Sequence, residues 1–178
     1  MKEKGEHNNT IIKLDNCIFL GKGHSGSVYL MPDGRALKIF KDPDTCKEEY
    51  RTLERLKNGP YFPQPLEFHN HYMIREYISG KNIKTYIKEN GFSYELALKI
   101  INFLDYIIKS GFKKIDVRFA HIFLENNGSF RVIDPRNSYT RKKSYPNHLI
   151  GDLKDEKLLH DFFKVLEDER PDLYKKWK

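Results

Sequence analysis

The chain has 178 residues, of which 39% are hydrophobic and 13% aromatic. This hydrophobic content is enough to bury a core and excludes an intrinsically disordered chain. This length suits one domain or two small lobes that share a cleft. The 32 lysine and arginine residues outnumber the 25 aspartate and glutamate residues, and the net charge of +7 favours an anionic partner, whether nucleotide, nucleic acid or acidic protein.

Cysteine usage and hydropathy predict the compartment. Cys17 and Cys46 lie far apart without the spacing of metal ligands, as expected of reduced thiols in the cytoplasm. The first ten residues are polar and lack the apolar stretch of a signal peptide. The longest apolar segment, residues 100–108, is interrupted by Asn102 and Asp105 and is too short to span a membrane. We therefore expect a soluble, cytoplasmic protein without a membrane partner.

The N-terminal half has the pattern of an antiparallel sheet. Its short apolar runs, separated by turn residues, predict four strands at residues 17–23, 27–32, 36–41 and 72–78. Residues 60–68 contain three prolines and are expected to form an extended link. A helix is predicted over residues 42–56, in which Thr45 and Glu48 have the spacing of a capping box.

The C-terminal half has the pattern of helices and one hairpin. A helix is predicted over residues 93–111, with a stripe of apolar residues that ends before Gly111: Leu96, Ile100, Ile101, Leu104, Ile107 and Ile108. Asn127-Gly128 predicts a hairpin between residues 121–125 and 130–134. A second helix is predicted over residues 153–168, with one apolar face: Leu158, Leu159, Phe162, Phe163 and Leu166. Pro171 is expected to start a final short helix. Strands followed by helices predict an α+β protein of two lobes, joined near residues 77–81.

The segment GKGHSGSV, residues 21–28, matches the pattern Gly-x-Gly-x-x-Gly-x-Val. A dinucleotide-binding fingerprint must open a helix, whereas this segment continues into a predicted strand. The pattern therefore favours a glycine-rich hairpin whose backbone amides lie over phosphates, with a purely structural turn as the alternative.

Lys38 lies in the strand ALKIF with apolar neighbours on both sides. A lysine in a buried strand is costly unless its ammonium finds an anion, although on an edge strand it could face water. Glu49 shares a helical face with Leu53 and Leu56, and that face is expected to pack inward. Glu49 then needs a cation in the core, and we expect Lys38 to be its partner.

Two aspartates bracket the predicted hairpin. Asp116 precedes it and Asp134 ends it, each at the edge of an apolar run. They could be turn residues, or a pair of carboxylates that hold metal and phosphate.

Together these motifs resemble the protein kinase-like superfamily. The glycine motif, Lys38, Glu49, the hinge segment IREYISGKNI, Asp116 and Asp134 follow the order of that family over residues 15–137. The resemblance implies a two-lobed α+β kinase-like fold with an antiparallel-sheet N-lobe carrying one helix and a truncated, mainly helical C-lobe. It implies an N-terminal arm at residues 1–14, an N-lobe at 15–78 and a C-lobe at 79–178.

The resemblance also implies the roles of individual residues. Lys38 would hold the α- and β-phosphates of ATP, and Glu49 would orient Lys38. Asp116 would accept the proton of the substrate hydroxyl, and Asp134 would bind Mg²⁺ or Mn²⁺. The implied nucleotide-binding residues are Gly21, Lys22, Gly23, His24, Ser25, Gly26, Val28, Lys38, Glu76 and Ile78.

Five features depart from the family pattern. Lys-Ile-Asp replaces His-Arg-Asp before the catalytic loop, which predicts no control by activation-loop phosphorylation. Arg118 stands where many kinases have a lysine that neutralises the γ-phosphate. His121 replaces the metal-binding asparagine and is either a second metal ligand or a structural residue. Pro135 replaces the phenylalanine that follows the metal-binding aspartate in the family. Arg75 occupies the usually apolar gatekeeper position, where it lines the nucleotide site or pairs with a buried acid.

The C-terminal region sets the range of possible functions. The 44 residues after Asp134 are too few for the helical platform that positions peptide substrates in typical protein kinases. In this respect the chain resembles a minimal kinase, similar to the compact Rio- and Bud32-like group and to small bacterial kinase-like proteins. The basic segment at residues 136–145 is a solvated loop or a docking face for an acidic partner. The favoured function is a minimal Ser/Thr protein kinase. The alternatives are a kinase of a small-molecule hydroxyl and a nucleotide-binding pseudokinase or scaffold, and no nucleic-acid partner is expected.

Overall fold

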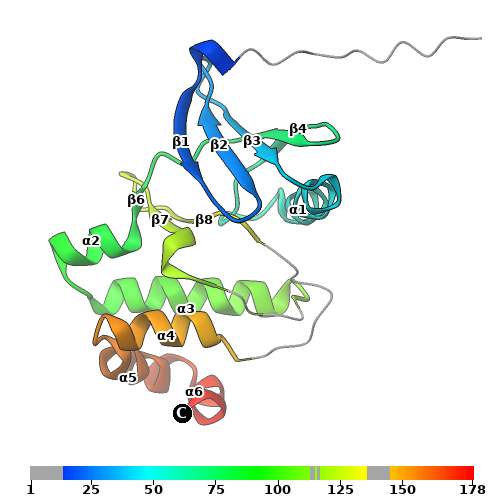
Figure 1. Cartoon of the computed structure of the whole chain (residues 1–178). Coiled ribbons are helices and arrows are strands. Elements are labelled where there is room, and N and C mark those ends of the chain that lie inside the picture. Colours follow the sequence, from blue (N-terminus) through cyan, green and yellow to red (C-terminus); the bar gives the residue numbers. More distant parts are fainter. Residues whose placement is uncertain (1–13, 113–114, 116, 136–144) are drawn as a thin grey trace, which may run out of the picture.

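The computed structural model describes residues 14–112, 115, 117–135 and 145–178, and in it an antiparallel sheet stands above a mainly helical part (Figure 1). The upper sheet has the strand order β1-β2-β3-β5-β4, after a short 3-10 helix, η1 (Leu14–Asn16). Its five strands are β1 (Ile18–Lys22), β2 (Gly26–Leu30), β3 (Ala36–Phe40), β4 (Pro65–Phe68) and β5 (Tyr72–Arg75).

Most of the predicted strands are present, with two differences. The strand predicted at residues 72–78 ends at Arg75, and the chain continues as the linker to the lower part. The expectation of a plain extended link at residues 60–68 was wrong, because β4 pairs with β5. Proline is tolerated there because Pro65 opens a strand at the edge of the sheet.

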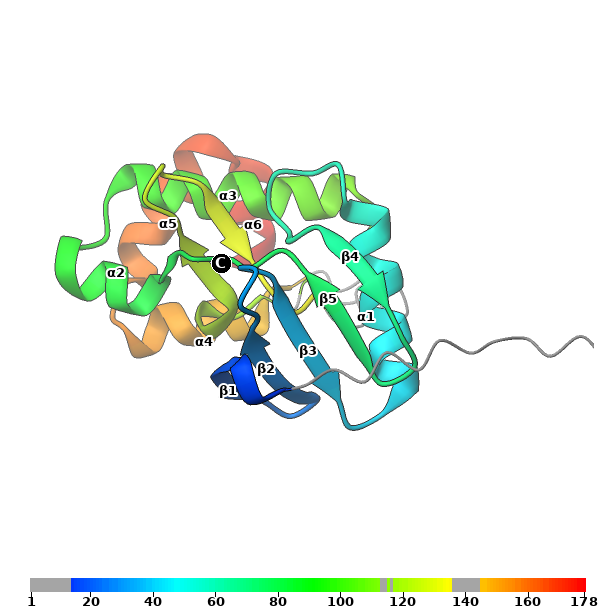
Figure 2. The ribbon, with the colours of Figure 1, turned by 90° about the horizontal axis from the view of Figure 1, so that it is seen from above.

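Helix α1 (Pro43–Leu56) packs beside β3, β4 and β5 (Figure 2). The capping box predicted from Thr45 and Glu48 was wrong, because the helix starts earlier, with Pro43 in its first turn. Asp42 is the N-cap, and its carboxylate accepts hydrogen bonds from the Thr45 amide at 2.9 Å and hydroxyl at 2.6 Å.

The lower part contains a second sheet of three short strands and five helices within the described ranges. Its elements are β6 (Lys81–Asn82), α2 (Ile83–Asn90), α3 (Tyr94–Lys109), η2 (Phe119–His121), β7 (Ile122–Leu124), β8 (Phe130–Val132), α4 (Asn147–Asp155), α5 (Leu159–Glu169) and α6 (Pro171–Trp177). The predicted hairpin is confirmed, with β7 and β8 antiparallel and Gly128 at φ 82° in the turn. Helix α2 was not predicted from the sequence.

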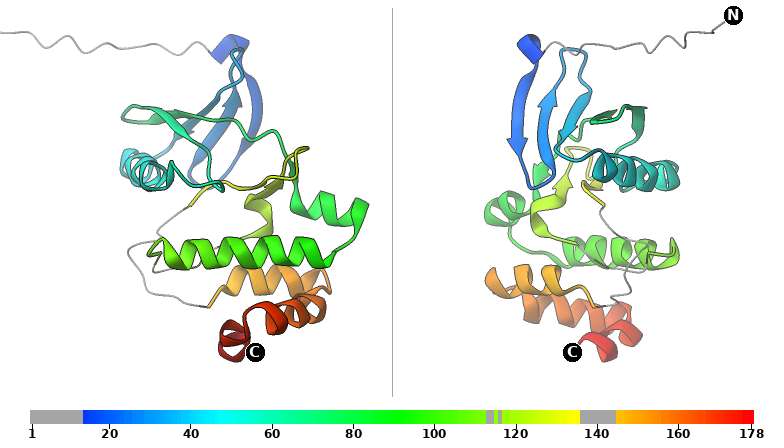
Figure 3. Two further views of the ribbon diagram at one scale, coloured as in Figure 1. Left: turned by 180° about the vertical axis from the view of Figure 1, so that it is seen from behind. Right: turned by 45° about the vertical axis from the view of Figure 1, so that its right-hand side comes forward.

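Helix α3 forms the centre of the lower core. It lies below the β7–β8 hairpin and above α4 and α5 (Figure 3). Seven of its 16 residues are buried, and they include five of the six predicted apolar positions, whereas Ile108 is 36% exposed. Each buried leucine, isoleucine or phenylalanine stabilises the packed state by about 1.5–3 kcal/mol relative to exposure. No helix in the described ranges is long and apolar enough to cross a membrane.

The single helix predicted over residues 153–168 was wrong. Helix α4 ends at Asp155 and α5 begins at Leu159, and Lys157 between them has φ 60°. The Leu158 amide donates to the Leu153 carbonyl at 2.8 Å, which closes the end of α4. The final helix predicted to start at Pro171 is confirmed as α6.

Candidate functional site

Lys38 is held between two carboxylates at the junction of the upper and lower parts. Its Nζ lies 2.8 Å from both carboxylate oxygens of Glu49 and 2.5 Å from Oδ1 of Asp134. The Lys38 and Glu49 side chains are each 2% exposed. The predicted partnership of Lys38 with Glu49 is therefore confirmed, and the alternative of a solvent-facing lysine was wrong. The contact with Asp134 adds a third member, from 96 residues further along the chain.

Local structure explains how these three residues meet. Lys38 lies on β3, opposite Val28 of β2 and Met73 of β5, so both neighbouring strands pair with it. Glu49 lies on the buried face of α1, which the inward-facing residues Leu53 and Leu56 hold against the sheet. A buried ammonium and carboxylate are tolerated only when both are paired, so the three groups constrain one another's positions.

Asp134 has a special backbone conformation. It follows β8 with φ 56°, in the left-handed region that residues other than glycine seldom adopt. The ladder continues up to it, because the Ile133 amide donates to the His121 carbonyl at 2.9 Å. A backbone held in this region costs about 1–3 kcal/mol and persists where surrounding contacts impose it.

The two carboxylates share one ammonium, and their pKa values move in opposite directions. Burial raises the pKa of Asp134, but the adjacent Lys38 outweighs it, helped by Arg75 and His121, and the pKa falls to about 2. For Glu49, burial and the negative charge of Asp134 dominate, so its pKa is raised despite Lys38. Asp134 is therefore the carboxylate that stays ionised, as a metal ligand must.

A cavity of about 440 Å³ opens between the β1–β2 hairpin, the linker after β5 and the β7–β8 hairpin. The predicted nucleotide-binding residues that line it are Gly21, Lys22, Gly23, Val28 and Ile78. Asp134 also lines it, as do the apolar side chains of Ala36, Phe123 and Ile133. The other predicted nucleotide-binding residues are not among its lining: His24, Ser25, Gly26, Lys38 and Glu76.

The glycines of the motif serve two different purposes. Gly21 and Gly23 have open space where a Cβ would stand. A Cβ on Gly26 would lie 1.8 Å from the carbonyl oxygen of Ile39, so Gly26 is required for close approach of β2 to β3. The Gly23 amide donates to the Gly26 carbonyl at 2.8 Å, which closes the hairpin.

The predicted catalytic loop is partly described. Asp116 lies outside the described residues, as does the basic segment at residues 136–144. Arg118 is exposed, with Nη2 3.0 Å from Nε2 of His148 on α4. His121 is half-buried and lies close enough to Asp134 for its charge to lower the pKa of that carboxyl. Among the described residues, no three His, Cys, Asp or Glu side chains form a group that could hold a metal ion.

Sequence reasoning missed the two residues that hold this loop. The Asn82 amide group donates to the carbonyl oxygens of Phe119 at 3.0 Å, Ala120 at 3.2 Å and Ile122 at 3.2 Å. Its Oδ1 accepts from the Lys84 amide at 3.0 Å and caps α2. An asparagine before a helix was the available signal for Asn82. Asp152 of α4, which no pattern indicated, accepts from the Phe119 amide at 2.8 Å.

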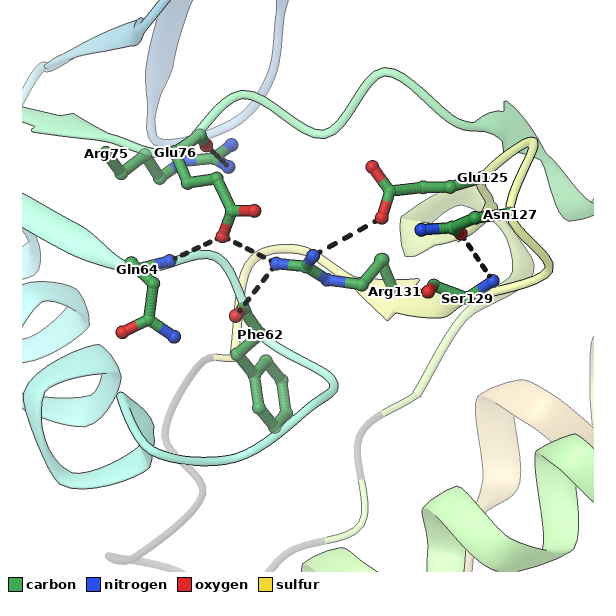
Figure 4. A network of polar contacts seen from close by, with 8 residues as sticks. All are labelled: Phe62, Gln64, Arg75, Glu76, Glu125, Asn127, Ser129 and Arg131. Atoms are coloured by element: carbon green, nitrogen blue, oxygen red, sulfur yellow. Dashed lines mark hydrogen bonds and ion pairs between the residues drawn. The ribbon is translucent and has the colours of Figure 1, made fainter.

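A second polar network joins the upper linker to the lower hairpin (Figure 4). Arg131 of β8 donates to Glu76 at 2.6 Å and to the Phe62 carbonyl at 3.2 Å, and it reaches Glu125 at 3.3 Å. The same oxygen of Glu76 accepts from the Gln64 amide at 3.0 Å. The Glu76 side chain therefore fixes the linker.

Arg75 is the last residue of β5 and only 4% exposed, although it lines the cavity. Its Nη1 lies 3.4 Å from the carbonyl oxygen of Glu76 (Figure 4). Its charge lowers the pKa values of Glu49 and Asp134, so it belongs to the same electrostatic cluster as Lys38. Of the two possibilities raised by the sequence, Arg75 lines the cavity, and it forms no ion pair with Glu49 or Asp134.

The fold and these residues define a two-part α+β protein with a buried Glu49–Lys38–Asp134 cluster beside a glycine-lined cavity. No family model matches the chain. It is 25% identical over 128 residues to the "Putative serine/threonine-protein kinase YrzF" of Bacillus subtilis, covering 68% of this chain and 60% of that protein. It is 28% identical over 130 residues to "Serine/threonine-protein kinase B" of Synechocystis, covering 58% of this chain and 23% of that protein.

A further match is the "Cysteine--tRNA ligase" of Methanococcus maripaludis, 25% identical over 135 residues, 71% of this chain and 28% of that protein. The chain thus spans less than two thirds of the length of each of these relatives. The chain is a distant homologue of serine/threonine protein kinases, within the protein kinase-like superfamily.

Proposed function

We propose that the protein is a metal-dependent phosphotransferase that transfers the γ-phosphoryl group of a nucleoside triphosphate to a hydroxyl group. The observation that carries the proposal is the position of Lys38, which is paired with Glu49 and with Asp134, and Asp134 lines the cavity under the glycine hairpin. Phosphoryl transfer depends mainly on positioning and on neutralising charge, which an oriented lysine and an ionised carboxylate supply.

The residues fall into two groups in this proposal. In the upper part, residues 15–78, the glycine hairpin would cover the phosphates and Lys38 would neutralise them, with Glu49 keeping its ammonium in place. In the lower part, residues 79–178, Asp116 would accept the proton of the attacking hydroxyl and Arg118 would neutralise charge on the transferred phosphoryl group.

The donor set fits a hard divalent cation in part. The Asp134 carboxylate is an oxygen ligand of the kind that Mg²⁺ prefers, whereas His121 offers an imidazole nitrogen, which suits Mn²⁺ better. Asp134 and His121 would hold such a cation, which would supply positive charge to stabilise the phosphates. Asp134 is engaged by Lys38, so Lys38 would move from Asp134 to the phosphates when the nucleotide and metal enter.

The substrate we favour is a Ser or Thr hydroxyl of a protein, because two of the relatives bear the name of serine/threonine kinases. A small-molecule hydroxyl is the second candidate, because the same lysine–carboxylate cluster can serve transfer to either kind of hydroxyl. A nucleotide-binding scaffold without turnover is the third, because His121 and Pro135 replace two residues of the family pattern. The cytoplasm is the proposed compartment.

The test is transfer of ³²P from γ-labelled ATP by the purified protein, with Mg²⁺ or Mn²⁺, using Asp116→Ala and Asp134→Asn as controls. We expect labelled protein or released phosphate from the parent chain and at least a hundredfold less from either variant, a loss typical of removing a general base. Nucleotide-dependent thermal stabilisation without turnover would identify a scaffold. The absence of any nucleotide effect would refute the proposal.

The role of His121 is tested by His121→Asn. If His121 is a metal ligand, this variant should keep its activity with Mg²⁺ or gain some, because the amide oxygen is a harder ligand than imidazole. Loss of folding in the variant would identify His121 as a structural residue instead.

A further inference from the structure

The guanidinium of Arg75 is buried and incompletely hydrogen-bonded. Among the described residues, its Nε has no hydrogen-bond partner, and its one hydrogen bond is the long contact of 3.4 Å from Nη1 to the Glu76 carbonyl. Neither Glu49 nor Asp134 forms an ion pair with it, so these carboxylates balance its charge from a distance. A buried arginine has five donors, and leaving them unpaired is costly. An acceptor from outside the chain would therefore satisfy this side chain.

The register of the sheet locates Arg75 within the cavity. Arg75 pairs with Ala36, and Met73 pairs with Lys38, so all four residues lie on one face of the β3–β5 ladder. Arg75 is the member nearest the linker, and Lys38 is nearer the interior. A molecule that extends from Lys38 to the linker passes Arg75 on its way.

The cavity that Arg75 lines has apolar side chains from both parts of the protein. Val28 and Ala36 of the upper sheet form one apolar wall, and Phe123 and Ile133 of the lower hairpin form the other. Apolar walls with a few placed polar groups are typical of small-molecule sites. Arg75 contributes hydrogen-bond donors between these walls, and the edge of a bound ring that faces Arg75 is its inner edge. A ring bound there is therefore selected by whether its inner edge carries an acceptor or a donor.

The purine bases differ at this edge. Guanine and hypoxanthine carry a carbonyl oxygen at C6 beside N7, two acceptors that an arginine can engage together. Adenine carries an amino group at C6, and its N–H donors would face the donors of Arg75. The Glu76 carbonyl could accept from that amino group with its second lone pair, but it also accepts from Arg75 Nη1, so the guanidinium donors lie beside any amino group bound there.

We propose that Arg75 is a specificity-determining residue that makes the protein prefer guanine nucleotides, or other purine nucleotides with a C6 carbonyl, over ATP as ligands of this site. This inference rests on the proposed function, because it assumes that the cavity binds a nucleoside triphosphate. The resemblance to kinases implies ATP as the phosphoryl donor, whereas Arg75 would shift the preference of this chain to a different purine base.

The test is the affinity of the full chain for GTP, ITP and ATP, each with MgCl₂, measured by isothermal titration calorimetry. ITP differs from ATP only at C6 and the adjacent N1, so this pair isolates the inner edge of the base. We expect GTP and ITP to bind about tenfold more tightly than ATP, within the range of a bidentate arginine–guanine contact. Arg75→Met should abolish this difference between GTP or ITP and ATP.

Two further variants complete the design. Arg75→Lys keeps the positive charge but lacks the planar fork, so it should lose most of the preference while retaining the charge balance of the buried cluster. Arg51→Met removes an exposed arginine of α1 and should leave the preference intact. If Arg75→Met fails to fold, Arg75→Lys and the comparison of ITP with ATP on the parent chain still decide the question.

The outcomes separate the two proposals. Equal or tighter binding of ATP by the parent chain, or a preference that survives in Arg75→Met and Arg75→Lys, would overturn the role of Arg75 while the phosphotransferase proposal stands. A failure of all three nucleotides to bind would refute the nucleotide site itself, and the base preference with it.

Discussion

Replacing Lys38 by Met is the most direct test of the buried cluster. The substitution keeps an unbranched, apolar side chain of similar length but removes the ammonium that pairs with Glu49 at 2.8 Å and with Asp134 at 2.5 Å. The buried Glu49 and the half-buried Asp134 then keep only the distant charge of Arg75. Removing one partner of a buried ion pair typically costs about 3–5 kcal/mol. Domains are usually stable by about 5–15 kcal/mol, so the variant should fold but with a small margin.

Urea unfolding followed by circular dichroism measures this loss. With a slope of about 2 kcal/mol/M, a loss of about 4 kcal/mol lowers the unfolding midpoint by about 2 M at pH 7. Lys57→Met is the matched control, because Lys57 pairs with Glu54 at 3.5 Å on the surface, and such pairs contribute about 0–1 kcal/mol. The double variant Lys38→Met/Glu49→Gln should lose less than the sum of its single changes, because Glu49→Gln removes one of the unpaired charges.

The pH dependence provides a second check on the same variant. The pKa of Glu49 is already raised by burial and by Asp134, and loss of Lys38 removes the main opposing charge. A carboxyl with a raised folded-state pKa stabilises the fold below its unfolded pKa, and this stability is lost as the pH rises through the folded value. The loss in Lys38→Met should therefore be smaller at pH 5 than at pH 7. A change in unfolding free energy of less than about 0.5 kcal/mol at pH 7 would refute the buried cluster.

Three further predictions concern the surrounding residues. Asn82→Ala removes the cap of α2 and three hydrogen bonds to the loop at residues 119–122. It should destabilise the protein by about 1–3 kcal/mol in urea unfolding and lower the rate of phosphotransfer, and an unchanged unfolding midpoint would contradict this role. Gly26→Ala should reduce the yield of folded protein sharply, because its Cβ would lie 1.8 Å from the Ile39 carbonyl, whereas Gly23→Ala should fold normally; equal melting temperatures would refute the distinction. The pKa of Asp134 is about 2 against an ordinary value of 3.8, which corresponds to about 2 kcal/mol of stability that is present above pH 3.8 and lost as the pH falls towards 2. The stability advantage of the parent chain over Asp134→Asn should therefore shrink between pH 5 and pH 2.5. A constant difference would show that Asp134 is not held by Lys38.

Local patterns in the sequence predicted most of the elements. Alternating apolar runs and turn residues located β1, β2, β3 and the β7–β8 hairpin. Helical periodicity located α3, Pro171 located the start of α6, and the helix predicted over residues 42–56 is α1. The misses lie where tertiary contacts override local preference. β4 forms despite three nearby prolines because it pairs at a sheet edge with β5, and the break between α4 and α5 is not marked by proline or glycine.

The contacts of the candidate site also fall into those that local sequence rules predicted and those that only tertiary packing creates. The partnership of Lys38 with Glu49 was predictable, because a lysine in a buried strand and a glutamate on a buried helical face each require an opposite charge. The contact of Lys38 with Asp134, and the support of the loop by Asn82 and Asp152, were not, because these residues meet only when the two parts of the chain are packed together. No periodicity or spacing records such long-range pairs.

By itself, the sequence determined the class of fold, the glycine hairpin and the identity of the charged residues that must be paired in the core. Those features follow from rules that act over a few residues: hydrophobic period, turn chemistry and the cost of burying an isolated charge. The tertiary structure decided which carboxylates share the Lys38 ammonium, how Glu76 is tied to Arg131, and that Arg75 lines the cavity. The reason is physical, since hydrogen bonds and ion pairs between distant segments depend on distances of a few ångströms that only the packed fold sets.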